Sequence, residues 1–249
     1  MNAYTDFSGV YDIFMDETPY DEWGVFVLNL MKEYGICDGL VAELGCGTGT
    51  MTEYMAKAGY DMIGIDNSPD MLNVAMEKKA ESGLDILYLC QDMRAFELYG
   101  TVRAMLSICD CINYVTEPED IAEIFKLVNN YLDKEGLFIF DFNTVHKYRD
   151  VIGDVTISEN REDCAFIWDN YFHEDDNINE YELTFFVREE DDMFRRFCET
   201  HYQRGYTLRE MKEYAKKAGL SFVNAYDGYS RNPADENTER VLMVLKKEA

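Results

Sequence analysis

Basic residues are scarce in this sequence. Its 249 residues include 23 Lys and Arg against 49 Asp and Glu, so the formal net charge is −26. Affinity for nucleic acids and for anionic lipid surfaces comes mainly from Lys and Arg side chains that displace counterions. We therefore expect neither a nucleic acid nor a membrane surface to be a partner.

Proline and long apolar runs are scarce as well. The four prolines mark no linker, and no Pro-rich or Gly/Ser-rich run is present. No apolar run is long enough to span a bilayer, and the N-terminus, MNAYTDFSGVYD, lacks the basic and apolar parts of an export signal. We expect a cytoplasmic protein whose 47% hydrophobic residues form a packed core.

Most of the seven cysteines lie in apolar, strand-like runs, without a CxxC pair or a nearby histidine. An odd number without pairing favours reduced, buried side chains. The Cys109-Asp110-Cys111 triplet would place both thiols on one face of a strand. No second ligand pair accompanies it, so we expect no metal site.

Short apolar runs alternate with helical patterns between about residues 25 and 142, which is typical of parallel strands joined by helices. The pattern predicts five strands, at Leu40–Leu44, Asp61–Ile65, Ile86–Leu89, Ala104–Cys109 and Gly136–Phe140. It predicts helices at Thr50–Ala58, Pro69–Lys79 and Ile121–Leu132. We therefore predict an α/β fold with a doubly wound, Rossmann-like sheet.

The pattern changes between about residues 156 and 203, where runs of Phe, Tyr, Ile and Val are separated by acidic clusters. Such runs favour antiparallel hairpins. Beyond them, a capping box at Thr207 begins a helix over Leu208–Ala218, and closing strands follow at Ser221–Ala225 and Arg240–Leu245. We predict an α/β domain of residues 1–145 and 206–249, with an antiparallel β insertion, residues 146–205, after the fifth strand.

Three glycines at alternate positions follow the first predicted strand. They lie in Glu43-Leu44-Gly45-Cys46-Gly47-Thr48-Gly49, just before a predicted helix, where backbone N–H groups can meet a ligand without a Cβ in the way. Asp66 and Asp92 follow the next two strands at the same edge of the sheet. Carboxylates there can accept hydrogen bonds from ribose hydroxyls or an adenine amine. The sequence therefore predicts a ligand that contains adenosine.

The glycine spacing helps to choose the cofactor. Dinucleotide sites favour G-x-G-x-x-G, but Thr50 stands where the last glycine would be. Glu43, two positions before the first glycine, would repel a pyrophosphate, whereas a cofactor with a sulfonium and an amino group tolerates it. The pattern favours S-adenosylmethionine over NAD, and it disfavours an NAD-dependent dehydrogenase.

These residues resemble the class I S-adenosylmethionine-dependent methyltransferases. Residues 43–49 resemble the first motif of that family, residues 64–68 its ribose-binding strand end, and residues 91–93 its adenine contact. Residues 109–114 are similar to the segment after its fourth strand, and residues 239–245 to its last strand. The Tyr11-Asp12 pair and the β-rich insertion are similar to a small-molecule subgroup that includes sugar N,N-dimethyltransferases and glycine N-methyltransferases.

The resemblance implies a set of residues that bind S-adenosylmethionine, with S-adenosylhomocysteine as the product. The set comprises Tyr11, Trp23, Glu43, Gly45, Cys46, Gly47, Gly49, Asp66, Asn67, Met71, Gln91, Asp92, Met93 and Cys109. The alternative for Tyr11 and Trp23 is that both pack the N-terminal helix on the sheet. Met71 is also compatible with a core position.

Methyl transfer from a sulfonium is an in-line displacement that needs alignment more than a strong acid. An amine acceptor must arrive neutral or lose its proton to a base. Strand alternation puts Glu199, His201 and Gln203 on one face, which by the resemblance faces the acceptor. His201 and Tyr114 are the catalytic candidates, and the substrate-binding candidates are Asn113, Tyr114, Glu199, His201 and Arg204. A histidine with a purely structural role is the alternative.

Residues 151–200 carry 15 acidic and 4 basic side chains. Such a run is compatible with a solvated face, or with a field that attracts a cationic acceptor. We expect a methyltransferase that acts on a small-molecule acceptor, for which an amine is a candidate. A non-catalytic sensor or scaffold that binds S-adenosylmethionine is the alternative, and the sequence does not indicate the oligomeric state.

Overall fold

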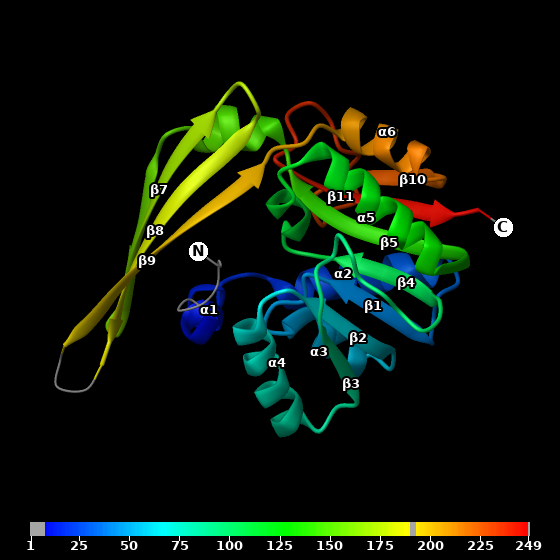
Figure 1. Ribbon diagram of the computed structural model, residues 1–249, viewed down its shortest axis with the longest axis horizontal. Helices are drawn as coiled ribbons and strands as arrows, with labels where there is room; N and C mark the ends of the chain where they lie inside the picture. The colour runs from blue at the N-terminus through cyan, green and yellow to red at the C-terminus, as the bar shows by residue number, and fades with distance from the viewer. Residues whose placement is uncertain (1–7, 190–192, 249) are drawn as a thin grey trace.

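The computed structural model describes residues 8–189 and 193–248. They form an α/β body and a second sheet that projects from it, with helix α1 (Ser8–Phe14) beside both (Figure 1). The central sheet has seven strands in the order β10-β11-β5-β4-β1-β2-β3. Their bounds are β1 Leu40–Leu44, β2 Asp61–Asp66, β3 Ile86–Cys90, β4 Val102–Ser107, β5 Leu132–Asn143, β10 Leu220–Asp227 and β11 Arg240–Lys247.

Parallel pairing defines the functional edge of this sheet. Strand β1 pairs in parallel with β2 and β4, β2 with β3, and β4 with β5. Strand β11 lies antiparallel between β5 and β10. Because the parallel strands run in one direction, their carboxyl ends meet at a single edge, and ligands of doubly wound sheets bind there.

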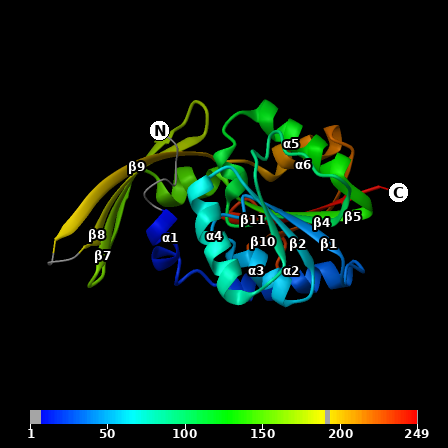
Figure 2. The ribbon, with the colours of Figure 1, turned by 60° about the horizontal axis from the view of Figure 1, so that its bottom comes forward.

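Helices cover both faces of the central sheet (Figure 2). Helices α5 and α6 pack on one face and α2 and α3 on the other, while α4 lies against β2 and β3. Strand β1 is buried on both sides, with Ala42 and Leu44 in one core and Val41 in the other. The helix bounds are α2 Tyr20–Glu33, α3 Thr50–Lys57, α4 Pro69–Ser82, α5 Pro118–Tyr131 and α6 Leu208–Lys217, and short helices η1 and η2 span Cys111–Tyr114 and Lys147–Ile152.

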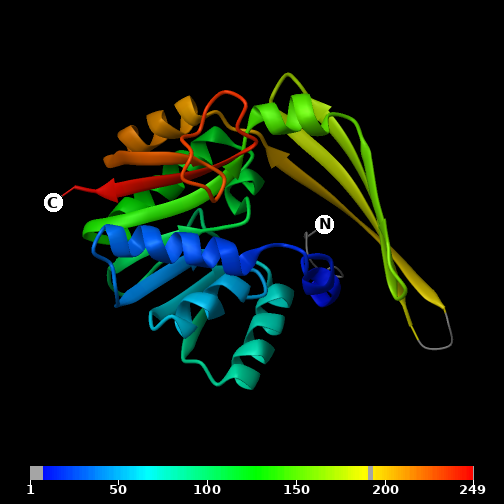
Figure 3. The ribbon, with the colours of Figure 1, turned by 180° about the vertical axis from the view of Figure 1, so that it is seen from behind.

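The second sheet has four antiparallel strands in the order β6-β7-β8-β9. Figure 3 shows it from behind, extending from the α/β body past α1. Phe14 of α1 packs on Phe166 and Phe185 of this sheet, with ring centroids 5.2 and 5.5 Å apart. Helix α1 therefore contacts the inserted sheet. The strand bounds are β6 Thr156–Asn160, β7 Cys164–His173, β8 Ile178–Arg188 and β9 Phe194–Arg204.

The predicted α/β class with its added antiparallel sheet is confirmed, but several predicted strand ends are wrong by two or three residues; β5, for example, ends at Asn143 and not at Phe140. Strand β4 ends at Ser107, two residues before the predicted end. Cys109 and Asp110 instead have left-handed φ angles of 69° and 51°, which non-glycine residues adopt only when their surroundings hold them there. The prediction that strand alternation puts the thiols of Cys109 and Cys111 on one face therefore does not apply, because both residues follow the end of β4.

The expectation of buried cysteines is wrong for three of the seven. Cys37, Cys90 and Cys198 are exposed, whereas Cys46 and Cys164 are buried. Cys198 alternates with the inward-facing residues of β9, so it lies on the outer face of that strand. In the part of the chain that the structure describes, no helix combines the length and the apolar character needed to cross a membrane.

Candidate active site

A small cavity lies at the carboxyl edge of the central sheet, between the turn after β1 and the turn after β4. Its volume is about 30 Å³. It brings together six of the residues predicted to bind the cofactor, namely Tyr11, Glu43, Gly45, Cys46, Gly47 and Cys109. The rest of its wall comes from Tyr20, Thr48, Thr50, Met51, Ile108 and Cys111.

The glycine turn after β1 presents its backbone to this cavity. Gly47 has a φ of 53°, and its N–H donates to Oδ2 of Asp66 at 2.8 Å. A Cβ at Gly47 would point into open space, whereas a Cβ at Gly49 would collide with the Tyr88 hydroxyl. The turn therefore leaves room for a ligand beside Gly47 and packs tightly at Gly49.

Two carboxyl groups beside the turn are shielded from water. Burial raises the pKa of Glu43 to about 8, although the hydrogen bond from the Thr52 hydroxyl acts in the opposite direction. Burial also raises the pKa of Asp66, whose carboxylate accepts hydrogen bonds from the backbone N–H groups of Gly47 and Ser68. A cationic ligand group next to Glu43 would offset the penalty of ionising it.

Helices α1 and α2 form the roof of the cavity through Tyr11 and Tyr20. Asp12 accepts a hydrogen bond from the Thr48 hydroxyl at 2.7 Å and pairs with Lys78 of α4 at 3.1 Å. A cavity of about 30 Å³ holds about one water molecule, whereas small-molecule pockets measure about 300–1,000 Å³. A cofactor of ordinary size can therefore enter only if the roof moves.

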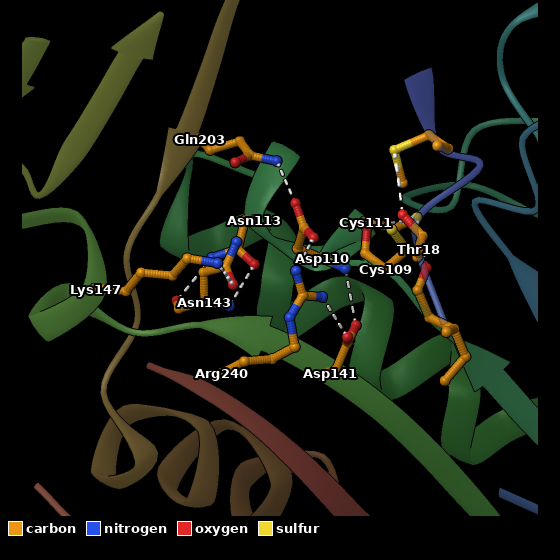
Figure 4. A network of polar contacts seen from close by, with 12 residues as sticks. Thr18, Cys109, Asp110, Cys111, Asn113, Asp141, Asn143, Lys147, Gln203 and Arg240 are labelled. Carbon is orange, nitrogen blue, oxygen red and sulfur yellow. Dashed lines mark hydrogen bonds and ion pairs between the residues drawn. The ribbon is translucent and has the colours of Figure 1, made fainter. Parts of the chain in front are cut away.

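A buried polar network stands on the other side of the turn after β4 (Figure 4). Arg240 of β11 donates to Asp110 at 2.6 Å and to Asp141 at 2.5 Å. The Asp110 N–H donates to Asp141 at 2.8 Å, and Gln203 of β9 donates to Asp110 at 2.8 Å. Burial acts to raise the pKa of Asp110, but Arg240, Lys147 and the hydrogen bond from Gln203 together outweigh it and keep that pKa below its ordinary value. The network holds the left-handed turn and ties it to the inserted sheet.

Trp23, predicted to bind the cofactor, lies next to this network. Its ring stacks on Tyr229 with centroids 4.4 Å apart, and the Arg240 guanidinium lies 5.3 Å from its centroid. Tyr229 in turn donates to Asp141 at 2.9 Å. Trp23 therefore contacts Arg240 from α2. Among the residues that the structure describes, Trp23 is not part of the cavity wall.

The other predicted cofactor residues lie along the same sheet edge. Gly49 caps α3, and Met71 is buried near the start of α4. Arg94 donates to the carboxylate of Asp92 and lowers its pKa, so an adenine amine would share Asp92 with this guanidinium. The remaining three, which follow β2 and β3, are Asn67, Gln91 and Met93.

Three of the predicted acceptor-side residues meet on the inner face of the inserted sheet. His201 is 2% exposed, its Nδ1 lies 3.4 Å from the Tyr114 hydroxyl, and its Nε2 lies 3.2 Å from Oε2 of Glu199. Tyr181 stacks on His201 with the ring planes at 10°, and its hydroxyl lies 2.7 Å from that of Tyr114. Two hydroxyls, an imidazole and a carboxylate therefore lie together, and two of the four residues, Tyr181 and His201, are buried.

Asn113 and Arg204, also predicted to bind substrate, make contacts that join elements. Asn113 donates to the carbonyl oxygens of Asn143 and Arg204 at 2.9 and 2.7 Å. The Arg204 guanidinium donates to the carbonyl of Thr116 at 3.3 Å and lies 5.7 Å from the centroid of the Tyr206 ring. These contacts fasten η1 to β5 and β9.

Sequence reasoning missed several residues of the site. Tyr20 lies one helical turn before Trp23, and Cys111 lies two residues after Cys109, so their proximity to predicted residues was an available signal. Arg240 carried no comparable signal for this network, because 130 positions separate it from Asp110. Tyr181 is paired with His201 only through the strand register.

Known proteins resemble this chain over most of its length. The methyltransferase domain family matches residues 41–136. A protein of Geobacillus sp. (strain WCH70) that is named as a methyltransferase is 31% identical over 246 residues, which are 98% of this chain and 100% of the relative. An S-adenosylmethionine-dependent methyltransferase from Clostridium acetobutylicum ATCC 824 superposes with a TM-score of 0.89 at 28% identity, over 100% of both chains.

A more distant structure shares the fold. CalS10 from Micromonospora echinaspora, described as an amino pentose methyltransferase with bound S-adenosylmethionine, superposes with a TM-score of 0.76 at 17% identity, over 99% of both chains. The chain belongs to the family of S-adenosylmethionine-dependent methyltransferases, and the predicted enzyme class and cofactor are confirmed. The open space beside Gly47 and the two buried carboxyl groups of Glu43 and Asp66 fit such a cofactor.

Proposed function

We propose that this methyltransferase acts on an amine of a small molecule, bound between the turn after β4 and the inner face of the inserted sheet. The cluster of Tyr114, Tyr181, Glu199 and His201 carries this proposal. An ionisable side chain that is 2% exposed, such as His201, is unfavourable unless it is paired or used. The description of CalS10 as an amino pentose methyltransferase agrees with an amine acceptor.

The cofactor residues have separate roles in this proposal. Glu43 receives the cationic amino end of S-adenosylmethionine, Asp66 the ribose and Asp92 the adenine amine. Tyr11 and Cys109 bound the cavity that receives the reacting end. When bound, the cofactor supplies an activated methyl group. The other predicted contacts, Trp23, Gly45, Cys46, Gly47, Gly49, Asn67, Met71, Gln91 and Met93, shape this edge of the sheet.

The chain contributes alignment and proton removal. Residues 146–205 act as an insertion that covers the acceptor, and residues 1–145 and 206–249 act as the domain that holds the cofactor. An amine attacks only with a free lone pair, so an ammonium must first lose a proton to a base. His201, reached through Tyr114, is the base, while Asn113 and Arg204 hold η1 and β9 in place around it.

Calorimetry and a transfer screen test this function. Titrations with S-adenosylmethionine, S-adenosylhomocysteine and NAD should show binding of the first two. A methyl-labelled cofactor is then offered with panels of small amines, alcohols and carboxylic acids, and we expect the label in the amines. The variant His201→Ala should lose about 100-fold in turnover with unchanged affinity for S-adenosylhomocysteine, whereas His173→Ala, at an exposed His–Glu pair, should keep both. Labelling of alcohols or acids alone would contradict an amine acceptor.

A further inference from the structure

Gln203, near the end of β9, is 3% exposed, and both ends of its amide make hydrogen bonds. Its Nε2 donates to Oδ2 of Asp110 at 2.8 Å (Figure 4), and its Oε1 accepts from the Tyr148 hydroxyl at 2.5 Å. A flipped amide would set Oε1 against the Asp110 carboxylate, which can only accept. The Gln203 side chain therefore joins the inserted sheet to the turn after β4 and to η2 in one defined orientation.

The hydrogen bonds that lead to Gln203 all point the same way. Nζ of Lys147 donates to Oδ1 of Asn143 at 3.0 Å, and Nδ2 of Asn143 donates to the Tyr148 hydroxyl at 2.9 Å. Tyr148 then donates to Gln203, which donates to the Asp110 carboxylate. Hydrogen bonds in such a chain polarise and strengthen one another. Reversing one of the buried amides would leave a donor or an acceptor unpaired, which is costly.

The next residue of β9, Arg204, contacts the other end of the same segment. Its carbonyl oxygen accepts from Nδ2 of Asn113 at 2.7 Å, and its guanidinium donates to the carbonyl of Thr116 at 3.3 Å. Asp110 and Asn113 are themselves joined, because the Asn113 N–H donates to the Asp110 carbonyl at 2.9 Å. Two consecutive residues of β9 therefore hold the turn after β4 and the helix η1 that follows it.

This segment lies between the two groups that methyl transfer must align. Cys109 lines the cofactor cavity, and Asp110 follows it with the second of the two left-handed φ angles. His201, two residues before Gln203 on the same face of β9, belongs to the proposed acceptor side. A misplacement of about 1 Å can cost about 100-fold in rate. A side chain that fixes β9 relative to this turn therefore acts on the rate of transfer.

We propose that Gln203 is a positioning residue for methyl transfer, because its amide fixes β9 relative to the turn that bounds the cofactor cavity. The inference rests on the proposed function for the place of the acceptor beside β9. Gln203 acts through Asp110 and exchanges no proton with the substrate. A structural role alone would change only stability, whereas a positioning role lowers kcat while the affinity for the cofactor stays the same.

Hydrogen exchange followed by mass spectrometry tests the hold on the turn without any acceptor. The variant Gln203→Leu removes the donor to the Asp110 carboxylate. We expect faster exchange of the backbone N–H groups of residues 110–114, which include the Asp110 N–H bonded to Asp141. Exchange at the wild-type rate in this segment would overturn the proposal.

Asn170→Leu is the matched control. Asn170 is 2% exposed and lies on the same face of the inserted sheet as Gln203. The hydrogen bonds of its side chain, to the carbonyl of Val155 and from Asn179, stay within residues 146–205. This variant also removes a buried amide from the sheet, but it should leave exchange in residues 110–114 unchanged.

Kinetics with the acceptor found in the transfer screen test the effect on the reaction. Gln203→Leu should lower kcat by about 10- to 100-fold, with unchanged KM and unchanged affinity for S-adenosylhomocysteine, and Asn170→Leu should keep the wild-type kcat. An unchanged kcat in Gln203→Leu would overturn the proposal. A raised KM with unchanged kcat would do the same, because Gln203 would then be a substrate ligand.

The variant Gln203→Glu keeps the size of the side chain and makes the rescue depend on pH. A protonated carboxyl can donate to Asp110, whereas an ionised one repels it. The ratio of the variant's kcat to the wild-type kcat should therefore fall as the pH rises, and a ratio that rises with pH would contradict the donor role. If Gln203→Leu does not fold, this variant carries both measurements, with faster exchange expected at high pH.

The outcomes separate this inference from the proposed function. Unchanged affinity for S-adenosylhomocysteine shows that a variant is folded. If the screen labels alcohols or acids and no amine, the proposed acceptor class fails. Hydrogen exchange, and kinetics with the labelled compound, still decide the role of Gln203.

Discussion

Arg240, the first residue of β11, donates from its guanidinium to the Asp110 carboxylate at 2.6 Å, although 130 positions separate them in the chain. The same guanidinium pairs with Asp141, which is fully buried. Arg240 therefore pairs with two carboxylates at once, one of which, Asp141, is fully buried. This relationship connects the last strand of the sheet to the turn beside the cofactor cavity.

Loss of this cation should destabilise the fold. We expect Arg240→Met to lower the free energy of unfolding by about 3–5 kcal/mol, because it leaves buried charge unpaired. A carboxyl group whose pKa is lowered by folding stabilises the folded protein at pH values above the ordinary carboxyl pKa of about 3.9. This stabilisation is lost as the pH falls through the lower pKa of the folded state. The difference between the variant and the wild type should thus shrink in acid. Urea denaturation at several pH values measures it.

An exposed ion pair provides the control for Arg240→Met. Arg103 and Asp38 pair at 3.0 Å with side chains that are 41% and 79% exposed, so Arg103→Met should cost less than about 1 kcal/mol. Equal losses of unfolding free energy in the two variants would mean that burial does not increase the contribution of the Arg240 ion pairs to stability.

Cofactor affinity should depend on the protonation of Glu43. With a pKa of about 8, this carboxyl is largely protonated at neutral pH, and a cationic group of the cofactor favours its ionised form. Affinity should therefore rise with pH up to about 8, by at most about tenfold per pH unit. Calorimetry in buffers of different ionisation enthalpy should detect a released proton.

The variant Glu43→Gln isolates this effect. The amino group of the cofactor titrates with either protein, so the difference between the two pH profiles belongs to Glu43. An identical pH dependence in both proteins would show that this carboxyl does not change its protonation when the cofactor binds.

The contacts of Asp12 should slow cofactor entry. Because Asp12 ties α1 to Thr48 and Lys78, we expect Asp12→Asn to raise the association rate of S-adenosylhomocysteine several-fold in stopped-flow measurements. Asp21→Asn removes the same charge from the start of α2 and serves as the control. Equal rates in the wild type and Asp12→Asn would mean that this contact does not limit opening of the roof.

The acidic insertion should favour cationic acceptors at low salt. Residues 151–200 carry 15 acidic and 4 basic side chains, and long-range attraction weakens as the Debye length falls from about 30 Å at 0.01 M to about 8 Å at 0.15 M salt. The kcat/KM for an amine that is charged at the assay pH should fall several-fold over this range. The kcat/KM for a neutral analogue of the amine should not change with salt. An equal salt dependence for the charged and the neutral compound would show that the acidic insertion does not attract the acceptor.

Much of the α/β body was predictable because its signals are local. Continuous apolar runs marked the buried parallel strands, and the Thr207–Glu210 capping box marked the start of α6, where both reciprocal hydrogen bonds are present. The turn after β4 was not predictable in this way. Its left-handed residues, Cys109 and Asp110, are held by Arg240 and Asp141, which approach from other strands.

The sequence by itself determined the class of sheet, the family and the cofactor, because the glycine turn and each acidic strand end are local patterns that directly follow a predicted strand. It also determined that Glu199 and His201 share a face, since strands repeat every two residues. Only the tertiary structure decided that Tyr114 and Tyr181 meet His201, that Trp23 stacks beside Arg240, and that the cavity is closed by α1. Those contacts join segments far apart in the chain, and their geometry depends on how whole elements pack rather than on local spacing.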